Sequence, residues 1–481
     1  MSKFNQNSPS MKTVNHEGHV AYKMSDKSKL VTQVLTSFFN EQKFYGDNSD
    51  EIKETIKRVI KTDPQFVSNL AVFARREFNM RSIAHVLTGY LAHEIEGKPF
   101  VRSTVKGISL RGDDITELMG FYISEFGKPI PNSLKKGIGE VLQTLDEYSL
   151  AKYKGSGKQV KMRDLLCLCR PKPTSKDQEA LWKRCLEGNL ETPYTWETEL
   201  SAKGNKKEVW EELIASHKVG YMAMLRNLRN ILQADPDNLD EALNYISNPQ
   251  AVKKSKQLPF RFLSAYQNIR GVGTSKTFDA LEDAIDASVE NLPKIPGRTI
   301  IAMDISGSMS STISSKSNIR CCDISVLLGL IANRICEDSI VYRFNHSIEK
   351  MDISRRGGLI EQTLRYGHPH GGTDMSLPFQ AMINGKIKAD RIIILSDNEC
   401  NGYGWLDGQG KAIQSYANQY RKITGNDIWV HAIDLQGYGT QQFHGPKTNI
   451  IAGWSEKVFD FILLAEQGEG NLEKRIKEYC W

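Results

Sequence analysis

The sequence predicts a multidomain protein in which an all-α helical array precedes a doubly wound α/β domain. The chain has 481 residues, which is too long for a single hydrophobic core. From about residue 25 to 289, apolar residues recur at helical spacing. After the segment 291–297, which contains two prolines and a glycine, strand-length apolar runs alternate with helical patterns. We therefore expect a helical domain over residues 20–297 and an α/β domain over residues 298–481.

The helical half carries start signals and amphipathic stripes. Asp63 followed by Pro64 is an N-cap with proline at the first helical position, and Ser175 with Gln178 fits a capping box. Two stripes at helical spacing are formed by Leu30, Val31, Val34, Leu35, Phe38 and Phe39, and by Met222, Leu225, Leu228, Ile231 and Leu232. Similar helix lengths and short connections predict helices stacked in pairs, as a degenerate repeat without a strict sequence period.

The composition narrows the protein class. Residues 1–19 are polar, lack the apolar stretch of a secretory signal, and are expected to be disordered. No run of 18 or more apolar residues occurs, so we expect no membrane span. The eight cysteines are scattered along a long chain, which favours a reducing cytoplasm over a disulfide scaffold.

The second half alternates strands with helices. We expect strands over Arg298–Asp304, Ser339–Phe344, Arg391–Ser396 and Asp427–Ile433, and helices over Ile319–Cys336, Asp374–Met382, Lys411–Ile423 and Lys457–Ala465. Such alternation implies βαβ units and a mostly parallel sheet with helices on its faces.

Oxygen-bearing residues follow two of the expected strands. Asp304, Ser306 and Ser308 follow the first strand, and Asp397 follows the strand that ends at Ser396. Thr373 lies after a Gly-Gly pair in a loop between them. Open α/β sheets bind ligands at the carboxyl ends of their strands, and two carboxylates with three hydroxyls suit Mg²⁺ or Mn²⁺. The sequence therefore predicts a metal site.

The motifs of the common catalysts are missing. Ser306 occupies the position where aspartyl-phosphate enzymes carry their general acid, two residues after the nucleophilic Asp. No Gly-x-Ser-x-Gly elbow surrounds the serines, and no Gly-rich phosphate loop occurs. His368 and His370 precede the Gly-Gly pair, where either a loop role or an approach to the ion is open. We expect a binding protein and not an enzyme.

The net positive charge comes from the first half of the chain. The net charge of +6 belongs entirely to residues 1–297, whereas residues 298–481 are neutral. Residues 151–176 contain eight Lys or Arg with Asp164 as their sole acid, and residues 251–276 contain six with no acid. Such blocks indicate either a polyanion-binding face or two solvated loops.

The three short motifs together resemble the metal-ion-dependent adhesion site of von Willebrand factor A domains. Asp-x-Ser-x-Ser, then Gly-Gly-Thr-Asp, then a strand ending in Ser-Asp fill all five ligand positions of that motif. The resemblance implies Ser306, Ser308 and Thr373 as direct ligands, with Asp304 and Asp397 acting directly or through water.

The helical half resembles the TROVE module of the Ro autoantigen family. The similar segments are Pro131–Ile138, Leu165–Pro173, Val209–Leu213 and Met224–Leu228, and in the adhesion loop Gly371–Pro378. The resemblance runs from about Gly18 to the C-terminus, in the same domain order, and suggests a bacterial or phage member. One departure is Arg170, at a position where the family often has His.

What the resemblance implies is a monomeric, cytoplasmic RNA-binding protein without DNA or membrane partners. HEAT-like helical repeats would close into a ring whose hole takes single-stranded 3′ ends of misfolded RNA. A small noncoding, Y-like RNA would bind the outer basic face. Members act in RNA quality control, and bacterial members can tether a 3′ exoribonuclease through the RNA.

The candidate RNA contacts are cations of the basic stretch and of the helix before it. They are Lys135, Lys136, Lys152, Lys154, Lys158, Lys161, Arg163, Arg170 and Lys172. Tyr148 and Tyr153 lie among them, where they either stack on bases or pack between helices. The alternative function is a protein–protein adhesion or scaffold module, whose metal captures an acidic side chain of a partner.

Overall fold

The computed structural model describes residues 12–15, 20–35, 49–153, 159–290, 292–313, 317–400, 413–453, 456–468 and 472–481. The chain divides into two compact units. The first comprises residues 1–25 and 195–471, and the second comprises residues 26–194 and 472–481.

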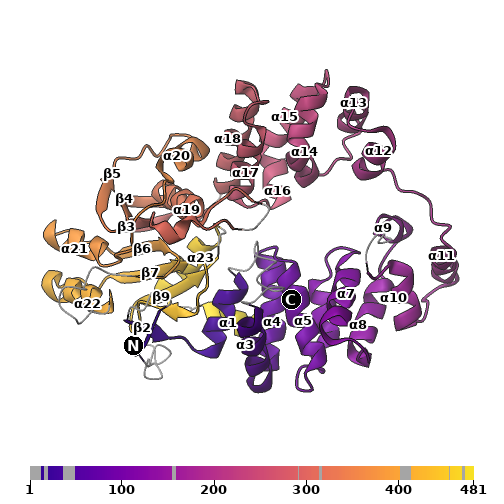
Figure 1. The fold of residues 1–481 in the computed structure, drawn as a ribbon, viewed down its shortest axis with the longest axis horizontal. Coiled ribbons are helices and arrows are strands. Elements are labelled where there is room, and N and C mark those ends of the chain that lie inside the picture. The colour runs from indigo at the N-terminus through magenta and orange to yellow at the C-terminus, as the bar shows by residue number, and fades with distance from the viewer. Residues whose placement is uncertain are drawn as a thin grey trace. The chain divides into compact units, whose positions relative to one another are not determined.

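The second unit is helical (Figure 1). Its helices are α1 (Asp26–Leu35), α3 (Ser49–Thr62), α4 (Pro64–Glu77), α5 (Ser82–His93), α6 (Val101–Ile108), α7 (Asp114–Phe126), α8 (Asn132–Leu142), α9 (Glu147–Lys152), α10 (Met162–Cys169), α11 (Lys176–Glu187) and α24 (Leu472–Lys477). The predicted starts are confirmed: Asp63 caps α4 by accepting the Phe66 N–H at 3.1 Å, and Ser175 caps α11 by accepting the Gln178 N–H at 3.1 Å.

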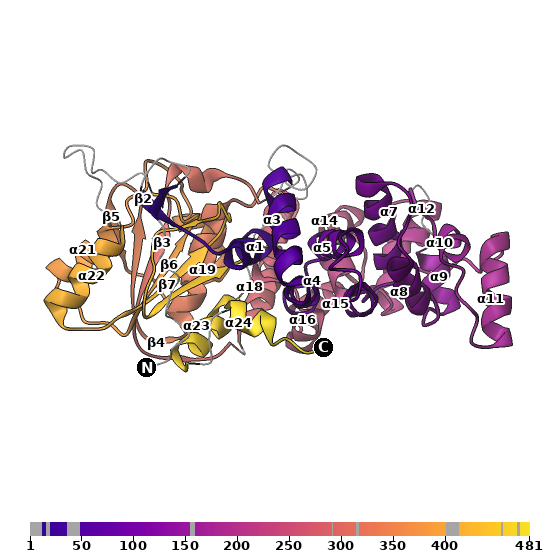
Figure 2. The same cartoon turned by 90° about the horizontal axis from the view of Figure 1, so that it is seen from below.

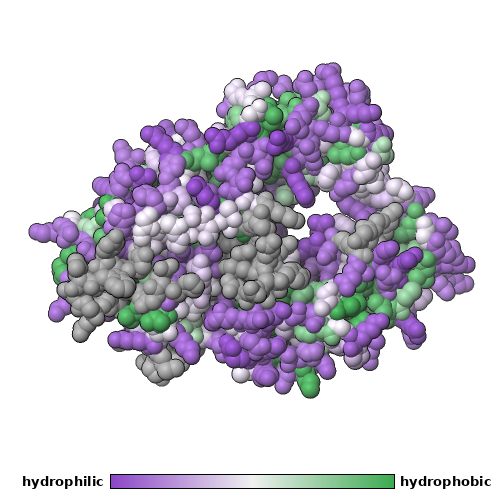
Figure 3. Space-filling model, in the orientation of Figure 1, coloured by the Kyte–Doolittle hydropathy of each residue, from purple (hydrophilic) through white to green (hydrophobic). Residues whose placement is uncertain are grey.

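These helices stack in two layers. Helices α4, α6, α8 and α10 contact one another in succession, and α3, α5 and α7 form a second row beside them. Each consecutive pair therefore contributes one helix to each row, which is the paired stacking that the sequence predicts. Figure 3 shows hydrophilic residues over α11, at the right-hand edge of that view, where the helix turns its polar face to solvent.

The last residues of the chain belong to this helical unit. We expected them in the α/β domain, but α24 packs on α4 and α1. Asn69 donates to the carbonyls of Ile476 and Lys477 at 3.1 and 2.9 Å, and the Tyr479 hydroxyl donates to Glu77 at 2.8 Å. These contacts join residues about 400 positions apart, so no local pattern indicates them.

The first unit begins with more helices and continues into the α/β fold. The helices are α12 (Trp196–Lys203), α13 (Lys207–Ala215), α14 (Tyr221–Ala234), α15 (Leu239–Ser247), α16 (Pro249–Ser255), α17 (Pro259–Ile269) and α18 (Ser275–Val289). The Glu282 carboxylate of α18 accepts the backbone N–H groups of Ile360 and Glu361 at 3.1 and 2.9 Å. Those groups begin α20 (Leu359–Tyr366), so α18 caps a helix of the α/β fold.

A six-stranded sheet forms the centre of the α/β fold, in the order β5-β4-β3-β6-β7-β9. Its strands are β3 (Ile295–Asp304), β4 (Cys336–Phe344), β5 (Ile348–Met351), β6 (Arg391–Ser396), β7 (Trp429–Asp434) and β9 (Thr448–Ala452). All neighbours pair in parallel except β4 with β5. Helices cover both faces, with α21 (Leu377–Asn384) and α22 (Ile413–Thr424) on the opposite side from α19 (Cys321–Ile335) (Figure 2). The predicted doubly wound sheet is confirmed.

A small second sheet corrects the expectation for the N-terminus. Residues 12–14, expected to be disordered, form strand β1 (Lys12–Val14), which pairs with β2 (Val20–Lys23), and β2 pairs with β8 (Thr440–Gln441). Residues 1–11 and 16–19 lie outside the described residues. Strands this short owe their pairing to tertiary context, because three residues carry no periodic signal.

A buried ion cluster fixes the last helix of the α/β fold, α23 (Val458–Glu466), to the sheet. Arg391 donates two hydrogen bonds to Glu466, at 2.6 and 2.8 Å, and the His431 Nε2 lies 3.0 Å from the same carboxylate. Burial alone would raise the pKa of Glu466, but the hydrogen bonds from His431 and Arg391 outweigh it and lower the pKa to about 2.

We expect Glu466→Gln to lower the free energy of unfolding by about 3–5 kcal/mol, because the buried Arg391 loses its counter-charge. Urea unfolding measures this, with Glu361→Gln as the control because Glu361 is exposed. Since the folded-state pKa lies below the ordinary value, the Glu466 contribution is present at neutral pH and is lost as pH falls toward about 2. An equal loss in both variants would contradict this role for the cluster.

Candidate metal site and nucleic-acid interface

The connections of the sheet create a topological switch point between β3 and β6. From β3 the chain passes through α19 to β4 on one side, and later returns to β6 on the other side. A crevice opens at the carboxyl ends of strands where the winding reverses in this way. Asp304 is the last residue of β3, and Asp397 directly follows β6, so both predicted carboxylates lie at the carboxyl edge of the sheet where the winding reverses.

Two loops are joined at the same edge by backbone hydrogen bonds. The Gly307 N–H donates to the Gly371 carbonyl, and the His370 N–H donates to the Ile305 carbonyl, both at 2.8 Å. Gly371 has a φ of +72°, and a Cβ there would lie 2.2 Å from His346 Nδ1. Glycine is therefore required at Gly371, and the closure brings the Gly-Gly-Thr loop that contains Thr373 to the Ser306 loop.

Four of the five predicted ligand residues are buried, and the fifth is half-buried. Asp304, Ser306, Thr373 and Asp397 are all buried, and Ser308 is half-buried. The Ser306 and Ser308 hydroxyl oxygens lie 3.2 Å apart. The solvent side of the site is therefore the Ser308 side.

Within the described residues, the hydrogen bonds that Asp304 accepts come from uncharged groups. Asp304 accepts the Ser306 N–H at 2.8 Å and the Ser396 hydroxyl at 2.5 Å. Burial, together with the charge of Asp397, raises the pKa of Asp304 to about 7. A bound divalent cation would relieve this repulsion, and the oxygen-only donor set fits Mg²⁺ or Mn²⁺.

Other metal chemistries find less support in the described part of the chain. No group of three or more His, Cys, Asp or Glu side chains there could hold an ion, so a site at this edge depends on hydroxyl ligands. His368 and His370 are exposed on their loop, where His370 Nδ1 lies 2.8 Å from the His368 carbonyl. This contact favours the loop role over the metal role for both histidines.

Sequence reasoning missed two residues of this edge. Asp434 ends β7 and accepts the N–H groups of Gln436 and Gly437 at 2.9 and 2.8 Å, so it holds a turn beside the site. The His346 ring centroid lies 6.3 Å from that of His370. Asp434 could have been found from the sequence, because it directly follows the expected strand over residues 427–433. No pattern in the neighbouring sequence indicates His346.

The candidate RNA contacts lie on α8, α9 and α10 of the helical unit. Lys136 is exposed on α8, and Lys135 is half-buried facing α10, where its charge opposes the effect of burial that raises the pKa of Cys169 to about 12. The loop after α10 returns to α8, because Gln143 donates to the Lys172 carbonyl at 2.8 Å. Arg170 ends α10 with a φ of +47° and is exposed.

Two tyrosines lie among these cations. The Lys152 Nζ lies 5.4 Å from the ring centroid of Tyr148 and 5.6 Å from that of Tyr153. Arg111, which sequence reasoning missed, lies 5.5 Å from the Tyr153 ring. Tyr148 is 48% exposed, which leaves ring surface for a base. Tyr148 is therefore available for stacking on a base, whereas Tyr153 packs against side chains.

Few of the predicted RNA contacts form ion pairs with acidic side chains in the described part of the chain. Of the nine predicted contacts, Lys154 and Lys158 lie outside the described residues. Among the seven described ones, ion pairing is confined to Arg163, whose Nε lies 3.7 Å from Asp164. The neighbouring cations Arg102 and Lys106, by contrast, both pair with Glu140.

The second basic stretch is less uniform. Lys276 pairs with Asp240 at 3.2 Å. Burial lowers the pKa of Arg261 to about 10, and the nearby charge of Arg226 lowers it further in the same direction. The stretch is therefore partly neutralised and partly buried, which weakens it as a polyanion surface.

Stacked helix pairs followed by an α/β domain with an adhesion-type metal motif define a class of helical-repeat proteins with a von Willebrand factor A domain. Comparison with family models agrees. The TROVE domain model matches residues 21–189 and 182–278, and the Ro60 vWA domain model matches residues 298–447. The chain belongs to the TROVE family, and its two domains are those of Ro proteins.

Individual relatives are distant. The chain is 25% identical over 199 residues to RNA-binding protein RO60 of Deinococcus radiodurans, covering 37% of each, and 27% identical over 250 residues to RNA-binding protein RO60 of Caenorhabditis elegans, covering 49% of the chain and 38% of the relative. Telomerase protein component 1 of Rattus norvegicus is 24% identical over 335 residues. This match covers 13% of the relative's length. The chain thus spans well under two thirds of these relatives.

The fold has a solved counterpart. The crystal structure of the Deinococcus radiodurans RO (RSR) protein superposes with a TM-score of 0.65, at 18% identity, over 92% of this chain and 100% of that chain. Neither matched family model describes an enzyme, in agreement with the expectation of a non-catalytic protein. Within the described ranges, no helix is long and apolar enough to cross a membrane.

We expect Mg²⁺ to stabilise the parent chain by about 2.7 kcal/mol at a hundred times its dissociation constant, and to have no such effect on Asp397→Asn. With a chelator present, Asp397→Asn should be at least as stable as the parent, because it removes the repulsion on Asp304. Thermal unfolding with Mg²⁺ and with EDTA measures both effects, and the exposed Asp352→Asn serves as the control. Equal stabilisation of all three proteins by Mg²⁺ would rule out this site.

Proposed function

We propose that this protein binds RNA through a cationic face on α8, α9 and α10. The observation that carries the proposal is a set of exposed cations around an exposed tyrosine, for which the described part of the chain offers no ion pair. Lys136, Lys152 and Arg170 are exposed there, and the Tyr148 ring lies within reach of Lys152. Cations neutralise phosphates and aromatic rings stack on bases, which together are the elements of single-strand binding.

The family supports a more specific form of this proposal. Two relatives carry the name RNA-binding protein RO60. On that basis the ligand of the cationic face is a small structured noncoding RNA of the Y type. Single-stranded 3′ ends of misfolded RNA are a second ligand, taken into the hole of a helical ring. The protein then serves RNA quality control in the cytoplasm, and its RNA tethers a 3′ exoribonuclease.

The metal site has a separate proposed role. Asp304, Ser306, Ser308, Thr373 and Asp397 would hold Mg²⁺ or Mn²⁺, which supplies a Lewis-acidic position for a carboxylate when bound. The half-buried Ser308 marks the side from which a partner's acidic side chain would approach. The second candidate function is therefore adhesion to an acidic protein partner, and it is compatible with RNA binding in another part of the chain.

Replacing Lys136, Lys152 and Arg170 by Ala should weaken RNA binding and flatten its dependence on salt. Each lost phosphate contact removes about 0.7–0.9 from the slope of log affinity against log salt. The measurement is the affinity for a stem-loop RNA with a single-stranded 3′ tail over a salt series.

The control for this measurement replaces three exposed cations elsewhere on the helical unit, namely Lys61, Lys98 and Lys183. It should leave affinity and slope close to those of the parent. An RNA that fails to bind the parent at low salt, or that loses as much affinity in the control as in the test variant, would refute the proposed face.

The adhesion function predicts the opposite pattern for the metal site. Asp304→Ala should leave RNA affinity unchanged, because the neutral α/β half contributes little to polyanion binding. It should abolish Mg²⁺-dependent capture of an acidic protein by the immobilised chain. A fall in RNA affinity with Asp304→Ala would instead assign the metal to RNA binding.

A further inference from the structure

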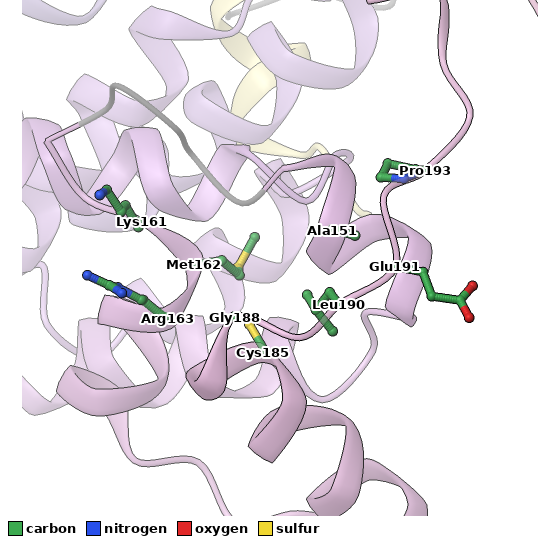
Figure 4. Close-up of a pocket in the computed structure, with 9 residues that line it drawn as sticks. All are labelled: Ala151, Lys161, Met162, Arg163, Cys185, Gly188, Leu190, Glu191 and Pro193. Carbon is green, nitrogen blue, oxygen red and sulfur yellow. The ribbon is translucent and has the colours of Figure 1, made fainter. Parts of the chain in front are cut away.

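A cavity of about 190 Å³ lies in the helical unit, between the end of α9, the start of α10 and the loop after α11. Its described lining combines an apolar interior with two cations (Figure 4). Met162, Leu190 and Cys185 supply the apolar part, Lys161 and Arg163 supply positive charge, and Glu191 supplies a carboxylate. None of these residues belongs to the metal site or to the tyrosine cluster.

The size and the lining of the cavity fit one planar ring. A dry cavity of about 150 Å³ in another protein is enough to bind benzene, so this volume admits a single aromatic ring system. Met162 and Cys185 are buried and Leu190 is half-buried. Methionine sulfur makes favourable contacts with aromatic rings and adapts to their shape. The interior therefore suits a flat, weakly polar group.

The charges define the two ends of the cavity. Figure 4 shows Lys161 and Arg163 side by side at one end, with their charged groups directed away from Leu190, and the Glu191 carboxylate directed away from Leu190 at the other end. Asp164 lies 3.7 Å from Arg163 and accepts the Lys161 N–H at 2.9 Å as a helix cap. That cap uses the backbone of Lys161 and leaves its ammonium group available for an anion.

We propose that this cavity binds one nucleoside monophosphate unit, with the base against Met162 and Leu190 and the phosphate on Lys161 and Arg163. The unit comes either from an RNA chain or from a free nucleotide. In its RNA form the inference rests on the proposed function. The cavity then adds a base contact to a face that otherwise recognises phosphate and stacking surface.

The direct test is saturation-transfer NMR of the full chain with AMP and with UMP. Base protons should receive more saturation than ribose protons, and ribose 5-phosphate should bind more weakly than either nucleotide. Leu190→Trp, which fills the cavity, should abolish the signal. Leu186→Trp is its control, because Leu186 is 47% exposed on α11 and does not line the cavity.

A second variant keeps the test decisive if Leu190→Trp fails to fold. Arg163 is exposed, so Arg163→Gln is expected to fold normally and to weaken AMP binding about tenfold, as expected for the loss of a charge-assisted contact. Lys183→Gln, exposed on α11, is the matched control. No AMP binding to the parent, equal binding to the folded Leu190→Trp, equal binding to Arg163→Gln, or equal binding of ribose 5-phosphate would overturn the proposal.

RNA affinity then identifies the source of the nucleotide. If Leu190→Trp weakens binding of a single-stranded oligoribonucleotide, the cavity takes a base of the RNA chain. If it abolishes AMP binding and leaves RNA affinity intact, the cavity serves a free nucleotide. Failure of the parent to bind any RNA would refute the proposed function, while the AMP titration would still decide on the cavity.

Discussion

The α/β half buries two carboxylates, Asp304 and Asp397, at the carboxyl edge of its sheet. Burial and the charge of Asp397 together raise the pKa of Asp304, so a cation bound beside them would favour the ionised pair. The apolar strands β3 and β6 set the two residues side by side, and the Gly307 and Gly371 loops close over them through backbone hydrogen bonds.

The helical half is expected to bind its ligand mainly through charge. Its functional candidates are cations, of which Arg163 alone forms an ion pair within the described residues, and long-range electrostatics with counterion release governs what such cations bind. The metal site and the cationic face lie in different compact units. Two binding chemistries can therefore coexist in this chain, one local and geometric, the other diffuse and dependent on salt.

The position of a candidate residue was predictable from the sequence wherever it depends on one strand end or one helix. Asp304 and Asp397 were predictable because an apolar run identifies a parallel strand and its carboxyl end. Arg111 was not, because its approach to Tyr153 joins the turn before α7 to the end of α9, about 40 residues further along the chain. Strand β1 and helix α24 escaped for the same reason: each is short and is held by partners about 400 residues away or by equally short strands. Tertiary contact, not local propensity, decides such elements.

The same distinction bears on selectivity for RNA. Contacts with phosphate position a nucleic acid but carry no sequence information, and stacking on an exposed tyrosine accepts any base. The cations of α8 to α10 and Tyr148 would therefore contribute to affinity for RNA without distinguishing one base sequence from another. Selection among RNAs requires a site where shape and polarity differ from one base to another. The base contact proposed for the cavity lined by Met162, Leu190, Lys161 and Arg163 would supply such a site.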